Sequence, residues 1–193
     1  MSTPAAKPSN WNIPNALTVL RILMVPVFAW LLLRHAGLDI PDRWWAFGVF
    51  AVAMITDRID GQIARSRGLV TDFGKIADPI ADKALTGAAF IGLSLIGELW
   101  WWVTIVVLVR EIGITLMRFV VIRYGVMPAG KGGKLKPVPQ AVALGLLVAP
   151  LGGIVFWIAC AVMAAAVIVT VVTGVDYVLA ARRMVAESKA DAR

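Results

Sequence analysis

The sequence predicts an all-α integral membrane protein with six transmembrane helices, and three observations lead to this fold class. Of the 193 residues, 60% are hydrophobic, and the mean hydropathy of +0.81 is that of a membrane protein. The apolar residues gather in six runs of a length suited to crossing a bilayer. Turn residues separate these runs. The chain is too short for two such bundles, so we expect one domain over residues 1–193, with an N-terminal cytoplasmic segment at 1–14 and a polar tail at 184–193.

Each expected helix is bounded by turn-forming residues. The first two are separated by Gly37 and Pro41, and the second ends at Ser66-Arg-Gly68. Thr71 is a suitable N-cap for the third helix, which ends at Gly97-Glu98. The fourth ends before a glycine-rich loop, and the fifth is the weakest because prolines and glycines crowd its ends. In chain order, the six helices are expected at about residues 16–34, 44–64, 74–97, 100–122, 138–152 and 154–181.

The charge pattern predicts the orientation in the membrane. The formal net charge is +7, but the basic residues lie at the ends of apolar runs, which fits anionic lipid headgroups better than nucleic acid. Basic residues follow the second, fourth and sixth runs, whereas the loop after the third carries only Glu98 and the loop after the fifth has no charge. By the positive-inside rule, both termini are cytoplasmic. We expect no nucleic-acid partner.

Four carboxylates stand at helical spacing around the loop between the second and third runs. Asp57 and Asp60 are three residues apart, and Asp78 and Asp82 are four apart, so each pair shares one face of its helix. Burying four like charges together is very costly unless a cation neutralises them. Ionisable residues at a membrane edge therefore indicate a functional site, which the charge pattern places at the cytoplasmic face.

The residues around these carboxylates indicate a phosphate-binding metal site. Ligands made of oxygen alone suit Mg²⁺ or Mn²⁺, and hard cations held in this way usually bind phosphates. Gly61 allows close approach of a ligand to the backbone, while Ala64 and Gly74 keep space beside the carboxylates. Arg65 offers a forked donor for phosphate. The competing interpretation is a set of structural ion pairs with Arg58, Lys75 or Lys83.

The whole segment reads D-x2-D-G-x2-A-R-x8-G-x3-D-x3-D, and this pattern resembles the signature of the CDP-alcohol phosphotransferases at every fixed position. The resemblance implies a six-helix bundle that forms a homodimer and uses an alcohol to displace CMP from a CDP-linked lipid. It also implies that Asp82 is the general base. The implied ligands of two divalent ions, Mg²⁺ or Mn²⁺, are Asp57, Asp60, Asp78 and Asp82. The implied nucleotide-binding residues are Asp60, Gly61, Ala64, Arg65 and Gly74.

Further segments resemble one branch of this family, the bacterial phosphatidylglycerophosphate synthases. They are Asn12-Ile-Pro-Asn15-Ala-Leu-Thr18-Val-Leu-Arg21, Asp78-Pro-Ile-Ala-Asp82-Lys83, Arg110-Glu111-Ile and Gly133-Lys134-Leu-Lys136. This chain has Pro137 where the branch usually has Thr. The resemblance implies an enzyme of the bacterial inner (cytoplasmic) membrane that moves the phosphatidyl group of CDP-diacylglycerol to sn-glycerol 3-phosphate, giving phosphatidylglycerol phosphate and CMP.

An acceptor that carries a phosphate needs cations near the reacting hydroxyl. The candidates lie in the first and fourth helices and in the lysine segment before the fifth; they are Arg21, Arg110, Arg118, Lys134 and Lys136. For each of them, a structural ion pair or a topology signal is the competing interpretation.

Three other functions remain open. The acceptor could be inositol phosphate or a second phosphatidylglycerol. A cation transporter would also carry buried acidic residues, but typically near mid-membrane and in inverted repeats. A membrane prenyltransferase would need a second Asp-rich motif, whereas Asp176 is the one aspartate between Asp82 and the polar tail.

Overall fold

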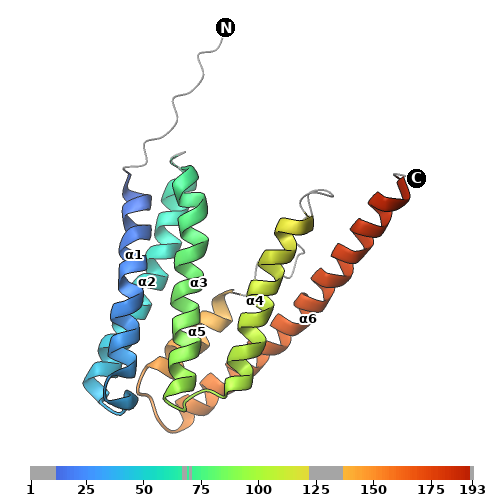
Figure 1. Ribbon diagram of the computed structural model, residues 1–193. Helices are drawn as coiled ribbons and strands as arrows, with labels where there is room; N and C mark the ends of the chain where they lie inside the picture. Colours follow the sequence, from blue (N-terminus) through green and yellow to red (C-terminus); the bar gives the residue numbers. More distant parts are fainter. Residues whose placement is uncertain (1–11, 67–68, 70, 122–136, 192–193) are drawn as a thin grey trace. The chain divides into compact units, whose positions relative to one another are not determined.

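The computed structural model describes residues 12–66, 69, 71–121 and 137–191 and is helical throughout, with no strand in these ranges (Figure 1). The elements in chain order are α1 (Ile13–Leu33), the 3₁₀ helix η1 (Arg34–Gly37), α2 (Ile40–Ser66), α3 (Asp72–Leu95), α4 (Trp101–Val121), α5 (Pro137–Val148) and α6 (Ile154–Asp191). They form two compact units. The first is Met1–Ile96 with Val148–Pro150, and the second is Gly97–Leu147 with Leu151–Arg193.

In the first unit, α1 is the helix that joins the other two. It packs extensively against both α2 and α3, whereas α2 and α3 touch each other only sparsely. Phe28 of α1 stacks on Phe50 of α2, with ring centroids 5.6 Å apart. On the other side, Leu32 of α1 lies so close to Gly92 of α3 that a Cβ at position 92 would meet its Cδ2 at 2.6 Å. Side chains of α1 can therefore reach residues of both α2 and α3.

Side-chain caps determine where α1 and α3 begin. The Asn12 side chain accepts a hydrogen bond from the Asn15 backbone N–H at 2.9 Å, and Pro14 occupies the first turn. Thr71 caps α3 by accepting from the Gly74 N–H at 3.0 Å. The predicted N-cap of the third helix is thus confirmed, and the cap also brings the loop residue Thr71 against the start of α1.

The turn between α1 and α2 is tight and contains three consecutive residues with positive φ. His35 and Ala36 have φ of 51° and 55°, and Gly37 has φ of 72°. A Cβ at position 37 would also meet the side chain of Ile96 at 2.9 Å, so only glycine fits there. The predicted break near Gly37 is confirmed.

In the second unit, α4 and α6 pack against each other. The side chain of Arg110 on α4 lies against Gly174 of α6, where an added Cβ would stand 3.2 Å from its Cγ. One guanidinium nitrogen of Arg110 donates to the hydroxyl of Thr173 at 3.4 Å, and another donates to Glu111 at 2.5 Å. A small residue on α6 thus makes room for a large charged residue on α4.

The six predicted helices are present, and two boundaries differ from expectation. The apolar run expected to continue to residue 152 stops being helical at Val148, since Pro150 disfavours helical geometry in the residue before it. The last helix continues to Asp191 instead of ending near 181, because the segment from 182 is rich in Ala, Lys, Arg and Glu, which favour helix. Most of the expected polar tail is therefore helical.

Among the residues that the structure describes, two helical segments are suited to crossing a membrane by length and apolar composition, Ile13–Gly37 and Ile154–Met184. The shorter segment Pro139–Val148 is also apolar. α2 and α3 carry the charged residues of the acidic motif, which lower their hydropathy. The charges of α2 and α3 therefore need partners from a neighbouring helix.

Candidate active site

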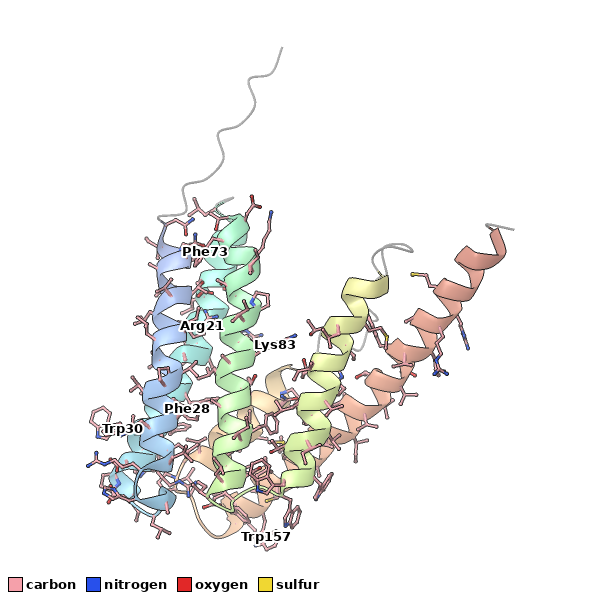
Figure 2. All side chains as sticks on the ribbon, in the orientation of Figure 1. Arg21, Phe28, Trp30, Phe73, Lys83 and Trp157 are labelled. Carbon is pink, nitrogen blue, oxygen red and sulfur yellow. The ribbon has the colours of Figure 1, made fainter. Side chains whose placement is uncertain are left out.

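Arg21 is the centre of the acidic motif in the first unit. Its guanidinium donates from Nη1 to Oδ1 of Asp57 and from Nη2 to Oδ2 of Asp60, so one arginine binds both carboxylates of α2. The side chains of Arg21 and Asp60 are 1% and 3% exposed, whereas Asp57 is 36% exposed. Figure 2 shows Arg21 pointing from α1 towards its neighbouring helices. A fixed cation thus compensates the two carboxylates within the membrane-spanning part of the chain.

Thr18, three residues before Arg21 on α1, contacts the acidic motif from α3. Its hydroxyl lies 2.5 Å from Oδ1 of Asp78 and 3.0 Å from the carbonyl oxygen of Pro14. Thr18 is 1% exposed. Because Thr18 and Arg21 are one helical turn apart, the carboxylates that they bind lie at neighbouring levels along α1. The structure therefore holds Asp57, Asp60 and Asp78 against α1, and the ligand atoms of these three carboxylates do not all lie within 4.8 Å of one another.

A second polar contact lies one turn earlier. Asn15 of α1 donates from Nδ2 to Oγ1 of Thr71 at 2.9 Å, and the Thr71 hydroxyl lies 3.0 Å from Oδ1 of Asn15. Gly74 faces this pair: a Cβ there would stand 3.0 Å from Asn15 Oδ1, 3.3 Å from Thr71 Oγ1 and 3.8 Å from Asp78 Oδ2. The glycine at this position permits the close approach of Asn15 and Thr71, and its role in keeping space for a nucleotide stays a prediction.

Asp82 follows Asp78 by one turn on α3 and is partly exposed. Its backbone carbonyl accepts a hydrogen bond from Thr86 at 2.8 Å. Lys83 projects from α3 on the side away from α1 (Figure 2). Partial exposure is what a general base needs, because the base must reach the hydroxyl that it deprotonates. The assignment of Asp82 as the base stays a prediction.

Gly61 and Ala64 lie on α2 beyond Asp60 and are partly buried. Arg65 follows them in the last turn of α2, and the structure describes its backbone only. The nucleotide-binding role of these three residues stays a prediction.

The donor set fits a hard divalent cation. Asp57, Asp60 and Asp78 are carboxylates held by α1, and each ionised carboxylate has about four lone-pair sites, more than its contacts with Arg21 or Thr18 require. Oxygen ligands of this kind select Mg²⁺ or Mn²⁺. Ion pairs of the competing interpretation do occur at two carboxylates, since Arg21 binds Asp57 and Asp60, whereas Lys75 pairs with Asp72 at 2.9 Å. The guanidinium of Arg21 compensates the negative charge of both carboxylates of α2.

A different group of possible ligand atoms lies near the turn between α1 and α2. Atoms of His35, Asp39 and Asp42 lie within 4.8 Å of one another, and within the described ranges this is the one group of three or more metal-binding residue types gathered so closely. Arg34 also approaches Asp42, at 3.5 Å, and Asp39 accepts from the Asp42 N–H at the start of α2. Arg34 already compensates the charge of Asp42, and Asp39 caps the start of α2. These contacts explain the cluster as part of the helix end, without a metal ion.

Of the predicted acceptor-binding cations, the structure describes the side chains of Arg21 in the first unit and Arg110 in the second. Arg21 is engaged by Asp57 and Asp60, and Arg110 by Glu111 and Thr173. Arg118 lies on α4 with only its backbone described, and Lys134 and Lys136 lie outside the described residues. Their roles stay predictions.

The contact between Asn15 and Thr71 and the bond from Thr18 to Asp78 are not predicted by the local sequence pattern. The partners are separated by 56 and 60 residues. One signal was available: Asn12, Asn15, Thr18 and Arg21 recur every three residues in an otherwise apolar helix. Polar residues that recur inside a membrane helix face protein and not lipid.

The fold and the site define a class, namely a helical membrane protein with an acidic motif contacted by its first helix. Comparison with known proteins identifies the family. The family model described as CDP-alcohol phosphatidyltransferase matches residues 11–188. The chain therefore belongs to the CDP-alcohol phosphatidyltransferase family, as the motif resemblance predicted.

Curated relatives are similar over most of the chain. A "Probable phosphatidylglycerophosphate synthase" of Mycobacterium tuberculosis (strain H37Rv) is 54% identical over 172 residues, which cover 89% of this chain and 82% of the relative. The "CDP-diacylglycerol--glycerol-3-phosphate 3-phosphatidyltransferase" of Bacillus subtilis (strain 168) is 36% identical over 180 residues, covering 86% and 93%. A "Cardiolipin synthase (CMP-forming)" of Streptomyces coelicolor is 33% identical over 117 residues, covering 61% and 54%.

Proposed function

We propose that the protein is a phosphatidyltransferase that moves the phosphatidyl group of CDP-diacylglycerol to sn-glycerol 3-phosphate, giving phosphatidylglycerol phosphate and CMP. The family match over residues 11–188 and the 54% identity to a relative with a synthase name support this reaction. The single structural observation that carries the proposal is that α1 contacts three carboxylates of the motif, Asp57, Asp60 and Asp78, which supply the kind of oxygen ligand that the counter-ions of a pyrophosphate need.

In this reaction one phosphorus–oxygen bond forms and one breaks. We assign Asp82 as the base that takes the proton from the C1 hydroxyl of glycerol 3-phosphate. The hydroxyl oxygen then attacks the phosphorus on the lipid side of the pyrophosphate, and the bond between that phosphorus and CMP breaks. The partial exposure of Asp82, one turn beyond Asp78, supports this assignment.

Asp57, Asp60, Asp78 and Asp82 would hold two divalent ions, Mg²⁺ or Mn²⁺. Such ions, when bound, neutralise charge on the pyrophosphate and on the departing CMP. Asp60, Gly61, Ala64, Arg65 and Gly74 would contact the nucleotide. The place of Gly74 near Asp78, whose Oδ2 would lie 3.8 Å from an added Cβ, supports its membership of this set.

The phosphate of the acceptor would be bound by cations of the second unit and of the segment before α5. Arg118, Lys134 and Lys136 are the candidates, with Arg110 beside Glu111 as a further one. Arg21 is the weakest candidate, because both of its terminal nitrogens already bind carboxylates.

We place the enzyme in the bacterial inner membrane as a homodimer, with both termini and the active site in the cytoplasm, and treat residues 1–193 as one functional domain. The distribution of basic residues supports the orientation. The family match, which runs through both structural units, supports a single domain.

The decisive experiment is a product assay with protein purified in detergent or nanodiscs. CDP-diacylglycerol is supplied together with glycerol 3-phosphate, inositol 1-phosphate, serine and phosphatidylglycerol, and the lipids are identified by mass. We expect phosphatidylglycerol phosphate as the dominant product and no turnover in excess chelator. Cardiolipin as the dominant product would move the protein to the activity named for its Streptomyces relative.

A further inference from the structure

The polar residues of α1 follow a helical path around that helix. Asn15, Thr18 and Arg21 recur every three residues, and three residues advance an α-helix by about 300°, which is about 60° short of a full turn. Successive members therefore point in steadily rotated directions. Asn15 contacts Thr71, the N-cap of α3, and Thr18 contacts Asp78 on α3 itself. Arg21 contacts both carboxylates of α2, Asp57 and Asp60.

This path links two helices that barely touch each other. Because α2 and α3 have few mutual contacts and both pack on α1, the relative height of their carboxylates depends on α1. Residues that reach both groups from one rigid helix can set this height within one helical turn, about 5.4 Å.

These buried side chains bind other protein side chains and are not accessible to a soluble substrate. Asn15, Thr18 and Arg21 are 5%, 1% and 1% exposed, so none of them offers a face to a soluble acceptor. Arg21 and Thr18 each bind carboxylates through hydrogen bonds that fix the side-chain rotamers. Partners that hold metal-binding carboxylates in this way commonly change metal affinity 10–100-fold when they are lost.

We propose that Thr18 and Arg21 are positioning residues, through which α1 orients Asp78 on α3 and Asp57 and Asp60 on α2 for divalent cations. The inference rests on the proposed metal site, and it gives Arg21 a role other than acceptor binding. It predicts that loss of either contact lowers the affinity for the divalent cation and leaves the KM for glycerol 3-phosphate unchanged at saturating cation.

Thr18→Val tests the contact to Asp78, and Thr56→Val is the matched control. Both threonines also bond to carbonyl oxygens of their own helix, Thr18 to Pro14 and Thr56 to Val52 and Ala53. Both variants lose that local bond, whereas only Thr18→Val loses a bond to a carboxylate. Mn²⁺ binding to purified protein without lipid substrate, measured by calorimetry or electron paramagnetic resonance, is the readout.

We expect Thr18→Val to weaken Mn²⁺ binding by about 10–100-fold, and turnover to recover at saturating Mn²⁺, while Thr56→Val binds Mn²⁺ like the wild type. Binding by Thr18→Val within twofold of the wild type would overturn the proposal for Thr18. If the wild type itself bound no Mn²⁺, the proposed metal site would fail, and the positioning role would fail with it.

Arg21→Lys tests the second contact without removing the positive charge. A lysine keeps the counter-ion for buried Asp60 but cannot donate to two carboxylates in the fixed fork of a guanidinium. We expect weaker Mn²⁺ binding, with an unchanged KM for glycerol 3-phosphate at saturating Mn²⁺. Unchanged Mn²⁺ binding with a raised KM for glycerol 3-phosphate would overturn the proposal and return Arg21 to the acceptor site.

Discussion

Asp60 and Asp82 belong to the same motif but stand in different surroundings. Asp60 is 3% exposed and bound by Arg21, whereas Asp82 is partly exposed on the next helix. This difference suits a buried ligand in one case and a base in the other. It can be tested because the two roles have separate readouts.

Asp60→Asn should abolish Mn²⁺ binding and turnover together, since it removes an anionic oxygen ligand. Asp82→Asn should lower kcat by several orders of magnitude while CDP-diacylglycerol still binds, because the other carboxylates remain. Calorimetry with CDP-diacylglycerol and a turnover assay measure the two effects. Asp72→Asn is the control, because Asp72 is 76% exposed and its pair with Lys75 contributes little. An Asp82→Asn enzyme with a tenth or more of wild-type turnover would contradict the base assignment.

At single positions, the sequence predicted residue types better than contacts. The acidic motif predicts that the four carboxylates need compensating cations, because burying like charges together is costly. It does not show that Arg21 would bind two of them, since that contact depends on how α1 rotates against α2. Contacts between residues that are 36 to 60 positions apart depend on how the helices pack, which the spacing of residues within one helix does not determine.

The packing of α1 on α3 is closest at Gly92. An added Cβ there would stand 2.6 Å from Cδ2 of Leu32, and Leu32 is fully buried, so it has little space to move. The glycine therefore determines how near the two helices can come.

Gly92→Ala should destabilise the protein. Overpacking costs about 1–3 kcal/mol, which exceeds the gain of about 0.5–1 kcal/mol from replacing glycine in a helix. Gly48→Ala is the matched control, since a Cβ at Gly48 would meet nothing within 4 Å; this variant should keep or slightly raise the stability. Thermal unfolding followed by tryptophan fluorescence compares them. An apparent Tm for Gly92→Ala at or above that of Gly48→Ala would contradict the packing argument.

Helix positions followed from the apolar runs, and the first four agree with the structure within a few residues. The errors lie where composition and backbone geometry disagree. Hydropathy extended the fifth helix through Ala149 and Pro150, although proline restrains the residue before it. The hydropathy pattern also predicted that the sixth helix ends where charged residues begin, near residue 181. The helix continues to Asp191, because Lys, Arg and Glu are good helix formers.

For the molecule as a whole, the basic residues make a prediction about orientation. Position 98 should face the periplasm and position 176 should lie near the cytoplasmic surface, if both termini are cytoplasmic. The chain has one cysteine, Cys160, so Cys160→Ser provides a cysteine-free background.

In that background, Glu98→Cys should react with a membrane-impermeant maleimide in intact cells, and Ser188→Cys should react only after permeabilisation. Labelling followed by gel-shift measures both. Serine 188 lies in the basic C-terminal part of the chain, and Glu98 in the loop with no basic residue. The reverse pattern of labelling would invert the proposed topology and place the acidic motif outside the cell.

The pairing of Arg21 with Asp57 and Asp60 also has a consequence for biogenesis. Because α1 and α2 are synthesised before α3, this helical hairpin contains its own counter-ion while the rest of the chain is still on the ribosome. An unpaired arginine or aspartate at the centre of an inserting helix costs about 2.5–3.5 kcal/mol. We therefore expect the hairpin to enter the lipid as a pair, and Arg21→Ala to lower its insertion efficiency in a translocation assay, whereas equal insertion would contradict this. The contact that shapes the finished site would then also guide the nascent chain into the membrane.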